Sequence, residues 1–241
     1  MKSFALKSLL FLSLPLLIAT TCKETKKKKP VVQQPKQETT PPSITQDTAK
    51  EMLVLIKTKF GNMKVKLYNE TPKHRDNFVK LAKEGYYKDL LFHRVMNTFM
   101  IQGGDPNSRG AAPGVQLGMG GPGYTVPAEF NQNLIHKKGA LAAARMGDQA
   151  NPRKESSGSQ FYIVQGTVQR EQDLQRSGIR YTPEQIKTYT SIGGTPFLDM
   201  QYTVFGEVIE GLDVIDKIAA VKTQNDRPLE DVKMDVEVLE N

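Results

Sequence analysis

The residue types that most often carry covalent or metal chemistry are scarce in this chain. Its 241 residues include one cysteine, Cys22, and three histidines, His74, His93 and His136. Cys22 lies in the N-terminal segment, and no two histidines have the HxxH or HExxH spacing of a zinc site. The sequence also contains no GxSxG or Walker motif. It therefore predicts no metal and no other cofactor.

The remaining candidates are charged or amide side chains set among large apolar ones. Arg94 follows Phe92-His93, and Gln102 follows the apolar run Phe99–Ile101. In an extended strand, successive side chains point to opposite faces, so such segments could present Arg94 and Gln102 from a β framework. The same pattern also fits a core strand with one arginine at its edge. The residues alone leave both readings open.

The elements that would position these residues are mostly strands. Residues 52–58 and 63–67 surround the turn Phe60-Gly61-Asn62 and predict a hairpin. Residues 232–238 alternate apolar and polar side chains, which is typical of a half-exposed strand. Between them, short apolar runs broken by Gly and Pro indicate a barrel or a sandwich.

Two amphipathic helices are predicted within this β framework. The first has Thr71 as N-cap, Pro72 at its first position and Gly85 just after its end. The second follows Gly211 and turns Val214, Ile215, Ile218 and Ala219 inward.

A polar segment, residues 168–193, stands apart from these elements. Its Thr182-Pro183-Glu184-Gln185 resembles a capping box ahead of Ile186 and Tyr189. We expect a largely helical insertion in the β framework, and the sequence does not indicate its role.

The charge is concentrated at the N-terminus. The net charge is +7, and residues 1–50 account for +6 of it, with nine lysines against three acidic residues. Residues 51–241 are therefore close to neutral. A nucleic-acid interface needs clustered Lys and Arg on the folded surface, so no nucleic-acid partner is expected. With 38% hydrophobic and 24% charged residues, the chain as a whole has the composition of a soluble globular protein.

The first 21 residues have the pattern of an export signal. Lys2 and Lys7 precede an apolar run over 9–18, which is shorter than the about 20 residues that a membrane-spanning helix needs. The stretch LLIATTC, residues 16–22, resembles a bacterial lipoprotein signal, and this resemblance implies that Cys22 is lipidated. An ordinary signal peptide with an incidental cysteine is the alternative. Residues 22–50, rich in Lys, Gln, Thr and Pro, predict a flexible tether.

Five blocks of residues 51–241 together resemble the cyclophilin family of peptidyl-prolyl cis–trans isomerases. In chain order they are TPKHRDNFVKLAKEGYY at 71–87, FHRVMNTFMIQGGDP at 92–106, GALAAAR at 139–145, SSGSQFYIV at 156–164 and FLDMQYTVFGEV at 197–208. The resemblance implies a mainly β fold, a closed eight-stranded antiparallel β-barrel capped by two α-helices, here with a helical insertion. It also implies an enzyme that accelerates rotation about X–Pro peptide bonds.

The family's site residues fall on matching positions of this chain. Arg94 stands at the position of the catalytic arginine, Gln102 at that of its polar partner, and Phe99 and Met100 in the proline pocket. Tyr162 stands where the pocket usually has phenylalanine, Phe197 where many eukaryotic members have tryptophan, and Tyr202 where they have histidine. The resemblance also implies substrate-binding positions at Ala144, Arg145, Gln160 and Leu198, and a structural role for His93 and His136. Asp105 and Asp199 have the pattern of turn-stabilising acceptors.

These features together predict a lipid-anchored isomerase at the cell envelope, on the periplasmic side or at the outer surface. Its expected partners are Pro-containing segments of exported proteins and, through Cys22, a membrane. No coiled-coil heptad is visible, so we expect a monomer. Two alternatives stay open: a proline-segment-binding chaperone without turnover, and a surface lipoprotein that acts through its insertion or its tether.

Overall fold

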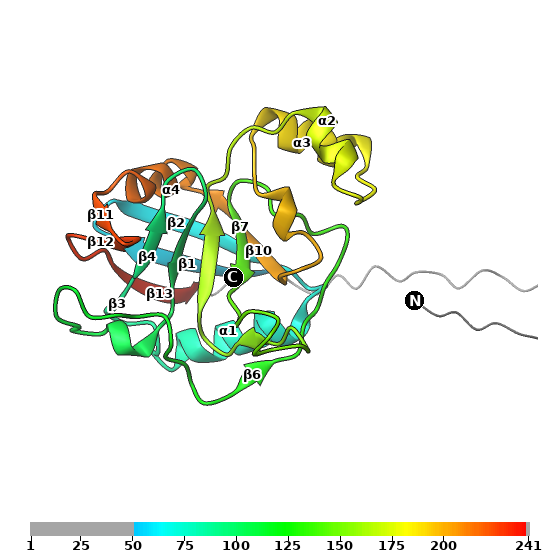
Figure 1. The fold of residues 1–241 in the computed structure, drawn as a ribbon. Coiled ribbons are helices and arrows are strands. Elements are labelled where there is room, and N and C mark those ends of the chain that lie inside the picture. The colour runs from blue at the N-terminus through cyan, green and yellow to red at the C-terminus, as the bar shows by residue number, and fades with distance from the viewer. Residues whose placement is uncertain (1–50, 240–241) are drawn as a thin grey trace, which may run out of the picture. The chain divides into compact units, whose positions relative to one another are not determined.

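The computed structural model describes residues 51–239. These residues belong to one compact unit, and its main feature is a nine-stranded antiparallel sheet with the order β3-β13-β1-β2-β10-β7-β9-β5-β4 (Figure 1). Its strands are β1 Met52–Thr58, β2 Gly61–Leu67, β3 Leu90–Leu91, β4 Arg94–Met96, β5 Met100–Gly103, β7 Ala140–Ala143, β9 Phe161–Val164, β10 Val204–Glu210 and β13 Lys233–Leu239. Two further pairs are small: β6 Thr125–Val126 with β8 Ser156–Ser157, and β11 Thr223–Gln224 with β12 Arg227–Pro228.

The sheet curls into a barrel. Side chains alternate along each strand, so on β7 and β9 every other residue joins an apolar cluster inside the barrel and the residues between them join a second apolar cluster outside it. On β4, β5, β9 and β7, Val95 pairs with Ile101, Ile101 with Ile163, and Ile163 with Leu141. All four belong to the main core inside the barrel. The neighbouring residues Met100 and Tyr162 point to the opposite face and belong to a second apolar cluster. That outer face carries the candidate site.

The two edge strands of the sheet are connected by the polypeptide backbone and not by inter-strand hydrogen bonds. β3 and β4 lie at opposite ends of the strand order, and only Phe92 and His93 separate them in sequence. The Phe92 N–H donates to Val232 O (2.9 Å), and the Val95 N–H donates to Asp226 O (2.7 Å). The predicted mainly β, barrel-like architecture is therefore confirmed. The strand count differs in detail, because the main sheet has nine strands and its edge strands β3 and β4 do not pair with each other.

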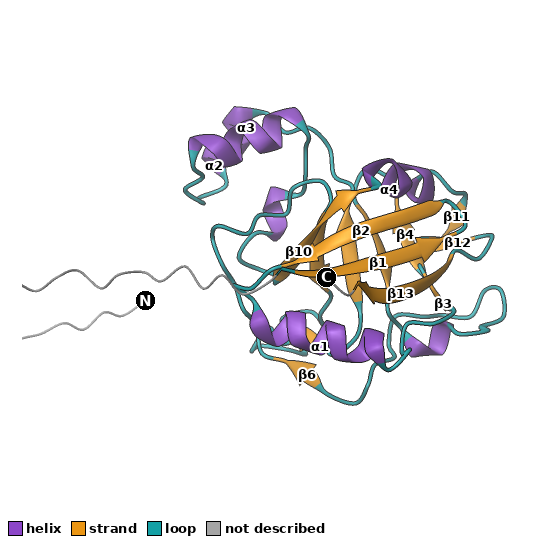
Figure 2. Cartoon of the chain, turned by 180° about the vertical axis from the view of Figure 1, so that it is seen from behind, coloured by secondary structure: helices purple, strands orange, loops and turns teal. Residues whose placement is uncertain are grey.

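Two helices cover the barrel as predicted, α1 Pro72–Lys83 and α4 Leu212–Ala219 (Figure 2). Their buried apolar side chains all join the main core: Phe78, Val79, Leu81 and Ala82 from α1, and Val214, Ile215, Ile218 and Ala219 from α4. At the C-terminus of α1, Gly85 has φ +69°, its N–H donates to Ala82 O, and the Tyr86 N–H donates to Leu81 O. This is a Schellman motif, which favours glycine because φ is positive.

The N-terminus of α1 is capped in a way that the sequence does not reveal. Thr71 occupies the N-cap position, but its hydroxyl makes no capping hydrogen bond. The Glu129 carboxylate instead accepts the N–H groups of Lys73 (3.2 Å) and His74 (3.0 Å), and it also bonds the His74 ring at Nδ1 (2.7 Å). A carboxylate 55 positions along the chain from His74 thus takes over the role expected of Thr71.

The insertion is helical, as predicted, and projects from the barrel (Figures 1 and 2). It contains α2 Glu171–Arg176 and α3 Pro183–Ser191. The capping box is present, since Thr182 accepts from the Gln185 N–H while the Gln185 side chain accepts from the Thr182 N–H. Short 3₁₀ helices occupy Pro106–Ser108 and Pro196–Leu198.

Residues 1–50 and 240–241 lie outside the described part of the chain. The predicted signal over 1–21, the tether over 22–50 and the lipidation of Cys22 fall there and stay predictions. Within residues 51–239, no helix has the length and apolar character required to cross a membrane.

Candidate active site

The predicted arginine and its polar partner lie side by side on the outer face of the barrel. Arg94 on β4 pairs with Gln102 on β5, and Gln102 pairs in turn with Tyr162 on β9. Residues opposite one another in a ladder share a face. The register therefore sets a cation, an amide and an aromatic ring in one row across three strands.

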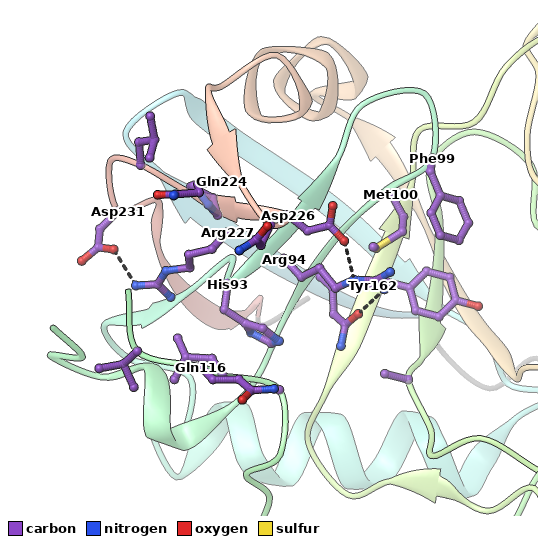
Figure 3. A pocket seen from close by; sticks show the side chains of 18 of the residues that line it. His93, Arg94, Phe99, Met100, Gln116, Tyr162, Gln224, Asp226, Arg227 and Asp231 are labelled. Atoms are coloured by element: carbon purple, nitrogen blue, oxygen red, sulfur yellow. Dashed lines mark hydrogen bonds and ion pairs between the residues drawn. The ribbon is translucent and has the colours of Figure 1, made fainter. Parts of the chain in front are cut away.

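The Arg94 guanidinium is held from three directions, and Figure 3 shows its contact with Asp226. Its Nε donates to Asp226 Oδ2 (3.3 Å), one terminal nitrogen to Gln102 Oε1 (3.3 Å), and the other to Met96 Sδ (3.0 Å). A guanidinium has five N–H groups, so each terminal nitrogen keeps one N–H. The side chain is 42% exposed. Arg94 is thus a fixed cation that still has donors for a ligand.

Behind this row, a chain of amides connects Gln102 to the neighbouring loop. Gln102 Nε2 donates to Gln160 Oε1 (3.1 Å), and Gln160 Nε2 donates to the carbonyls of Gly118 (2.9 Å) and Gly120 (2.7 Å). Gln160 is buried and does not line the groove. Gln160 therefore supports Gln102 from behind, and its predicted role in substrate binding stays a prediction.

Asp105 organises the same loop. Its buried carboxylate accepts the N–H groups of Asn107, Gly118 and Gly120. The prediction of a turn-stabilising acceptor is confirmed for Asp105. A Cβ at Gly120 would overlap Asp105 Oδ1, so a larger residue there would displace this carboxylate.

Next to Arg94, an apolar pocket opens between strands β5 and β9 and the segment after the insertion. Met100 and Leu198 are buried, Phe99 is half-buried, and the Tyr162 ring closes one side. The Tyr202 ring meets the Tyr162 ring edge-on, with centroids 5.9 Å apart. The predicted pocket residues therefore lie together on one surface.

Two predicted positions have particular environments. Phe197 is 67% exposed and is not part of the groove lining, but its ring lies 5.6 Å from that of Phe99. The Arg145 guanidinium lies 4.5 Å from the Tyr202 ring centroid and donates to Gln201 O (2.9 Å) and Asp148 Oδ1 (2.6 Å). Arg145 is therefore engaged within the protein, and together with Ala144 it lines the groove.

The pocket is one end of a larger groove of about 980 Å³ that continues past Arg94 (Figure 3). The loop 113–118 and the β11–β12 hairpin border its second half. The hairpin turn is Asn225-Asp226, both at positive φ (49° and 65°), as a type I′ turn requires. This turn places the Asp226 carboxylate against Arg94. The sequence analysis did not identify Asp226, the loop or the hairpin.

Two titratable side chains of the site, His93 and Tyr162, have pKa values shifted toward their neutral forms. Burial lowers the pKa of His93, at the floor of the groove, to about 4, while the carboxylate of Asp105 acts in the opposite direction. Burial also raises the pKa of the Tyr162 hydroxyl well above its ordinary value. Among residues 51–239, no group of three or more His, Cys, Asp and Glu side chains could hold a metal ion. Next to the apolar pocket, the site offers the Arg94 guanidinium as a fixed cation with free donors, supported by amide side chains.

This arrangement agrees with the comparisons to known proteins. The family model for "Cyclophilin type peptidyl-prolyl cis-trans isomerase/CLD" matches residues 53–238. A Staphylococcus saprophyticus protein named "Putative peptidyl-prolyl cis-trans isomerase" is 39% identical over 203 residues, covering 81% of this chain and 96% of that protein. A Staphylococcus aureus protein of the same name is 40% identical over 188 residues, covering 76% of this chain and 88% of its own length.

A solved structure shows the same fold. The cyclophilin-type isomerase of Cryptosporidium parvum aligns with a TM-score of 0.58 at 24% identity, covering 79% of this chain and 99% of that one. The chain belongs to the cyclophilin-type peptidyl-prolyl cis–trans isomerases. It is accordingly an enzyme of the class that interconverts the cis and trans forms of X–Pro bonds.

Proposed function

We propose that Arg94 and the adjoining apolar pocket accelerate X–Pro rotation without a covalent intermediate. The observation that carries this proposal is a guanidinium fixed on three sides at the edge of a pocket formed by Phe99, Met100 and Tyr162. Uncatalysed rotation crosses a barrier of about 20 kcal/mol and takes roughly tens of seconds. Rotation breaks no bond, so it needs no nucleophile and no proton shuttle.

The chemistry required is loss of amide resonance. When the C–N bond twists, the prolyl nitrogen becomes pyramidal, and an N–H donor of Arg94 can stabilise that nitrogen or the carbonyl oxygen beside it. Because Asp226, Gln102 and Met96 hold the guanidinium in place, it needs little reorganisation during the rotation. The apolar pocket holds the proline ring while the preceding residue turns.

The ligand class follows from the pocket and from a relative. A second structure of the Cryptosporidium parvum isomerase was obtained in the presence of the dipeptide Ala-Pro. We infer that Pro-containing polypeptide segments are the ligands of this groove, and that they come from exported proteins because of the N-terminal signal pattern.

The direct test is a peptide isomerisation assay on residues 51–241. Arg94→Ala should lower kcat/KM by at least about 100-fold, since one preorganised charged donor contributes that much to transition-state stabilisation. Arg94→Lys keeps the charge but not the planar set of donors, and should recover only part of the rate. Normal turnover by Arg94→Ala would overturn the mechanism. A folded wild-type domain that binds peptides without accelerating rotation would favour the proline-binding chaperone.

We also propose that a lipid on Cys22 anchors a monomeric enzyme at the cell envelope. The support is the apolar run over 9–18, which ends four residues before the only cysteine of the chain, and the Lys- and Pro-rich segment that follows. Cys22→Ser should move the protein from the membrane fraction to the soluble fraction of an expressing bacterium while the isomerase activity per molecule stays unchanged. Equal membrane association of both forms would contradict the anchor.

A further inference from the structure

The helical insertion is joined to the wall of the proline pocket by a buried chain of hydrogen bonds. Tyr189 on α3 and Tyr181 just before it both donate to Asp199 Oδ2, at 2.6 and 2.8 Å. Asp199 Oδ1 accepts from the His136 Nδ1–H (2.7 Å), and His136 Nε2 lies 3.0 Å from the Tyr162 hydroxyl. Three hydrogen bonds in series thus lead from the insertion to a ring that lines the groove.

The Asp199 carboxylate determines the direction of the hydrogen bonds around it, because it can only accept. The Asp199 carboxylate accepts four donors, the two tyrosine hydroxyls, the His136 Nδ1–H and the His136 backbone N–H (2.8 Å). A carboxylate can only accept, so His136 Nδ1 carries the proton of its contact with Asp199. The contact between His136 Nε2 and the Tyr162 hydroxyl completes the path to the pocket. Burial, with the charge of Asp199, raises the pKa of Tyr181 and Tyr189, so both stay donors.

Packing fixes the same residues. Tyr189 and His136 have no exposed surface, and Asp199 is 5% exposed. The rings of His136 and Tyr162 are stacked at an interplanar angle of 13°. Tyr189 packs with Ile135 and Leu174 in a small apolar cluster of its own. The insertion therefore has a rigid base on the segment that carries His136.

The backbone ties the base of the insertion to that segment as well. Gly194 forms bridges with Lys137 and Thr167, and the Thr195 N–H donates to His136 O (2.8 Å). A Cβ at Gly194 would lie 2.3 Å from His136 O, so only glycine permits this approach. Both ends of the insertion therefore pack against the segment that carries His136.

We propose that the insertion is part of the binding site, and that Tyr181 and Tyr189 are positioning residues that fix the Tyr162 wall of the proline pocket through Asp199 and His136. This inference rests on the proposed function of the groove. A phenylalanine at position 162 would supply the ring but not the hydroxyl that contacts His136. The hydroxyl of Tyr162 is therefore the feature that couples pocket and insertion.

The alternative is that the insertion only stabilises the fold. Both possibilities predict a lower melting temperature when its hydroxyls are removed, so stability alone does not separate them. Only the positioning role predicts weaker peptide binding in a domain that remains folded. It also predicts that the effects at the two ends of the chain depend on one another.

The experiment compares the full chain with Tyr181→Phe, Tyr189→Phe, the double variant, Tyr162→Phe and the triple variant. Tyr87→Phe is the matched control, because its buried hydroxyl bonds Ser159 O (3.3 Å) outside this chain. Kinetics are measured on a proline tetrapeptide well below every melting temperature. Affinity is measured separately, by NMR titration with the same peptide. Tyr181 is only half-buried, so its variant remains informative where Tyr189→Phe does not fold.

We expect the double variant to raise KM and the dissociation constant by about five-fold, the worth of one typical hydrogen bond, with kcat changed less than two-fold. Tyr162→Phe should have a similar effect, and the triple variant should be no worse than either. Unchanged affinity in the folded double variant, or independent, multiplying effects, would overturn the inference. If the wild type binds the peptide but does not turn it over, the proposed function fails while the titration still tests the positioning role.

Discussion

At the scale of single residues, Asp226 restrains the Arg94 guanidinium through an ion pair. The Asp226 carboxylate bonds Arg94 Nε at 3.3 Å, and both side chains are 42% exposed. A pair this exposed contributes at most about 1 kcal/mol to stability. Its main effect is therefore expected on the orientation of Arg94 and not on folding.

We predict that Asp226→Ala lowers kcat/KM by about three- to ten-fold, as expected when a positioning contact is lost, with a free energy of unfolding within about 1 kcal/mol of the wild type. Asp231→Ala is the control, since Asp231 pairs with Arg227 on the same border of the groove without touching Arg94. A faster Asp226→Ala enzyme would mean that Asp226 competes with the substrate for the guanidinium.

The sequence indicates Arg94 and Gln102 but not Asp226, for a physical reason. Arg94 and Gln102 are 8 positions apart in one hairpin, so strand alternation and a tight turn are enough to bring them together. Asp226 is 132 positions from Arg94. Only closure of the barrel brings them into contact. The hydrogen bonds that connect Tyr189 to Tyr162 also join residues distant in sequence, so the sequence does not indicate them.

At the scale of elements, the N-terminus of α1 is capped by a residue distant in sequence, Glu129, and not by the hydroxyl of its own N-cap residue, Thr71. Thr71 is buried and its hydroxyl has no hydrogen-bond partner among the described residues, whereas Glu129 bonds two backbone N–H groups and the His74 ring. We predict that Thr71→Val is neutral or slightly stabilising. Glu129→Ala should cost about 2 kcal/mol, because it leaves buried donors unsatisfied. Urea denaturation of both variants measures this difference.

Serine at position 71 offers a second check on the same helix. If Thr71→Val loses as much stability as a lost N-cap, about 1 kcal/mol, while Glu129→Ala loses nothing, the capping assignment is wrong. Thr71→Ser keeps the hydroxyl, so its free energy of unfolding should equal that of the wild type even if the hydroxyl caps the helix.

Elements with strong local signals are predictable from this sequence, and short ones are not. The first hairpin, α1, α4, the capping box and the last strand all carry periodicity or capping residues, and the structure contains each of them. Strands β3, β6, β8, β11 and β12 have two residues each. Two residues show no periodicity, so tertiary pairing alone defines these strands and the nine-stranded order.

At the scale of the whole molecule, the fold was predictable because five blocks of sequence follow the family's order over nearly all of residues 51–241. What they do not specify is how the two faces of the sheet divide their tasks. The inner face gives the core its stability, and the outer face holds the pocket, the cation and the insertion. Global stability and activity should therefore respond to different residues.

His93 is expected to make the stability of the whole domain sensitive to acid. Burial lowers its pKa to about 4, against about 6.5 in the unfolded chain. As pH falls below 6.5, the unfolded chain takes up the proton first, so stability is complete above pH 6.5 and declines toward pH 4. The difference in pKa corresponds to about 3 kcal/mol.

We predict that His93→Gln, which cannot titrate, lacks this part of the decline in stability. Carboxylates with lowered pKa, such as Asp216, act equally in both proteins. Urea unfolding at pH 7, 5.5 and 4 measures the two slopes, and equal slopes would show that His93 does not control the acid response.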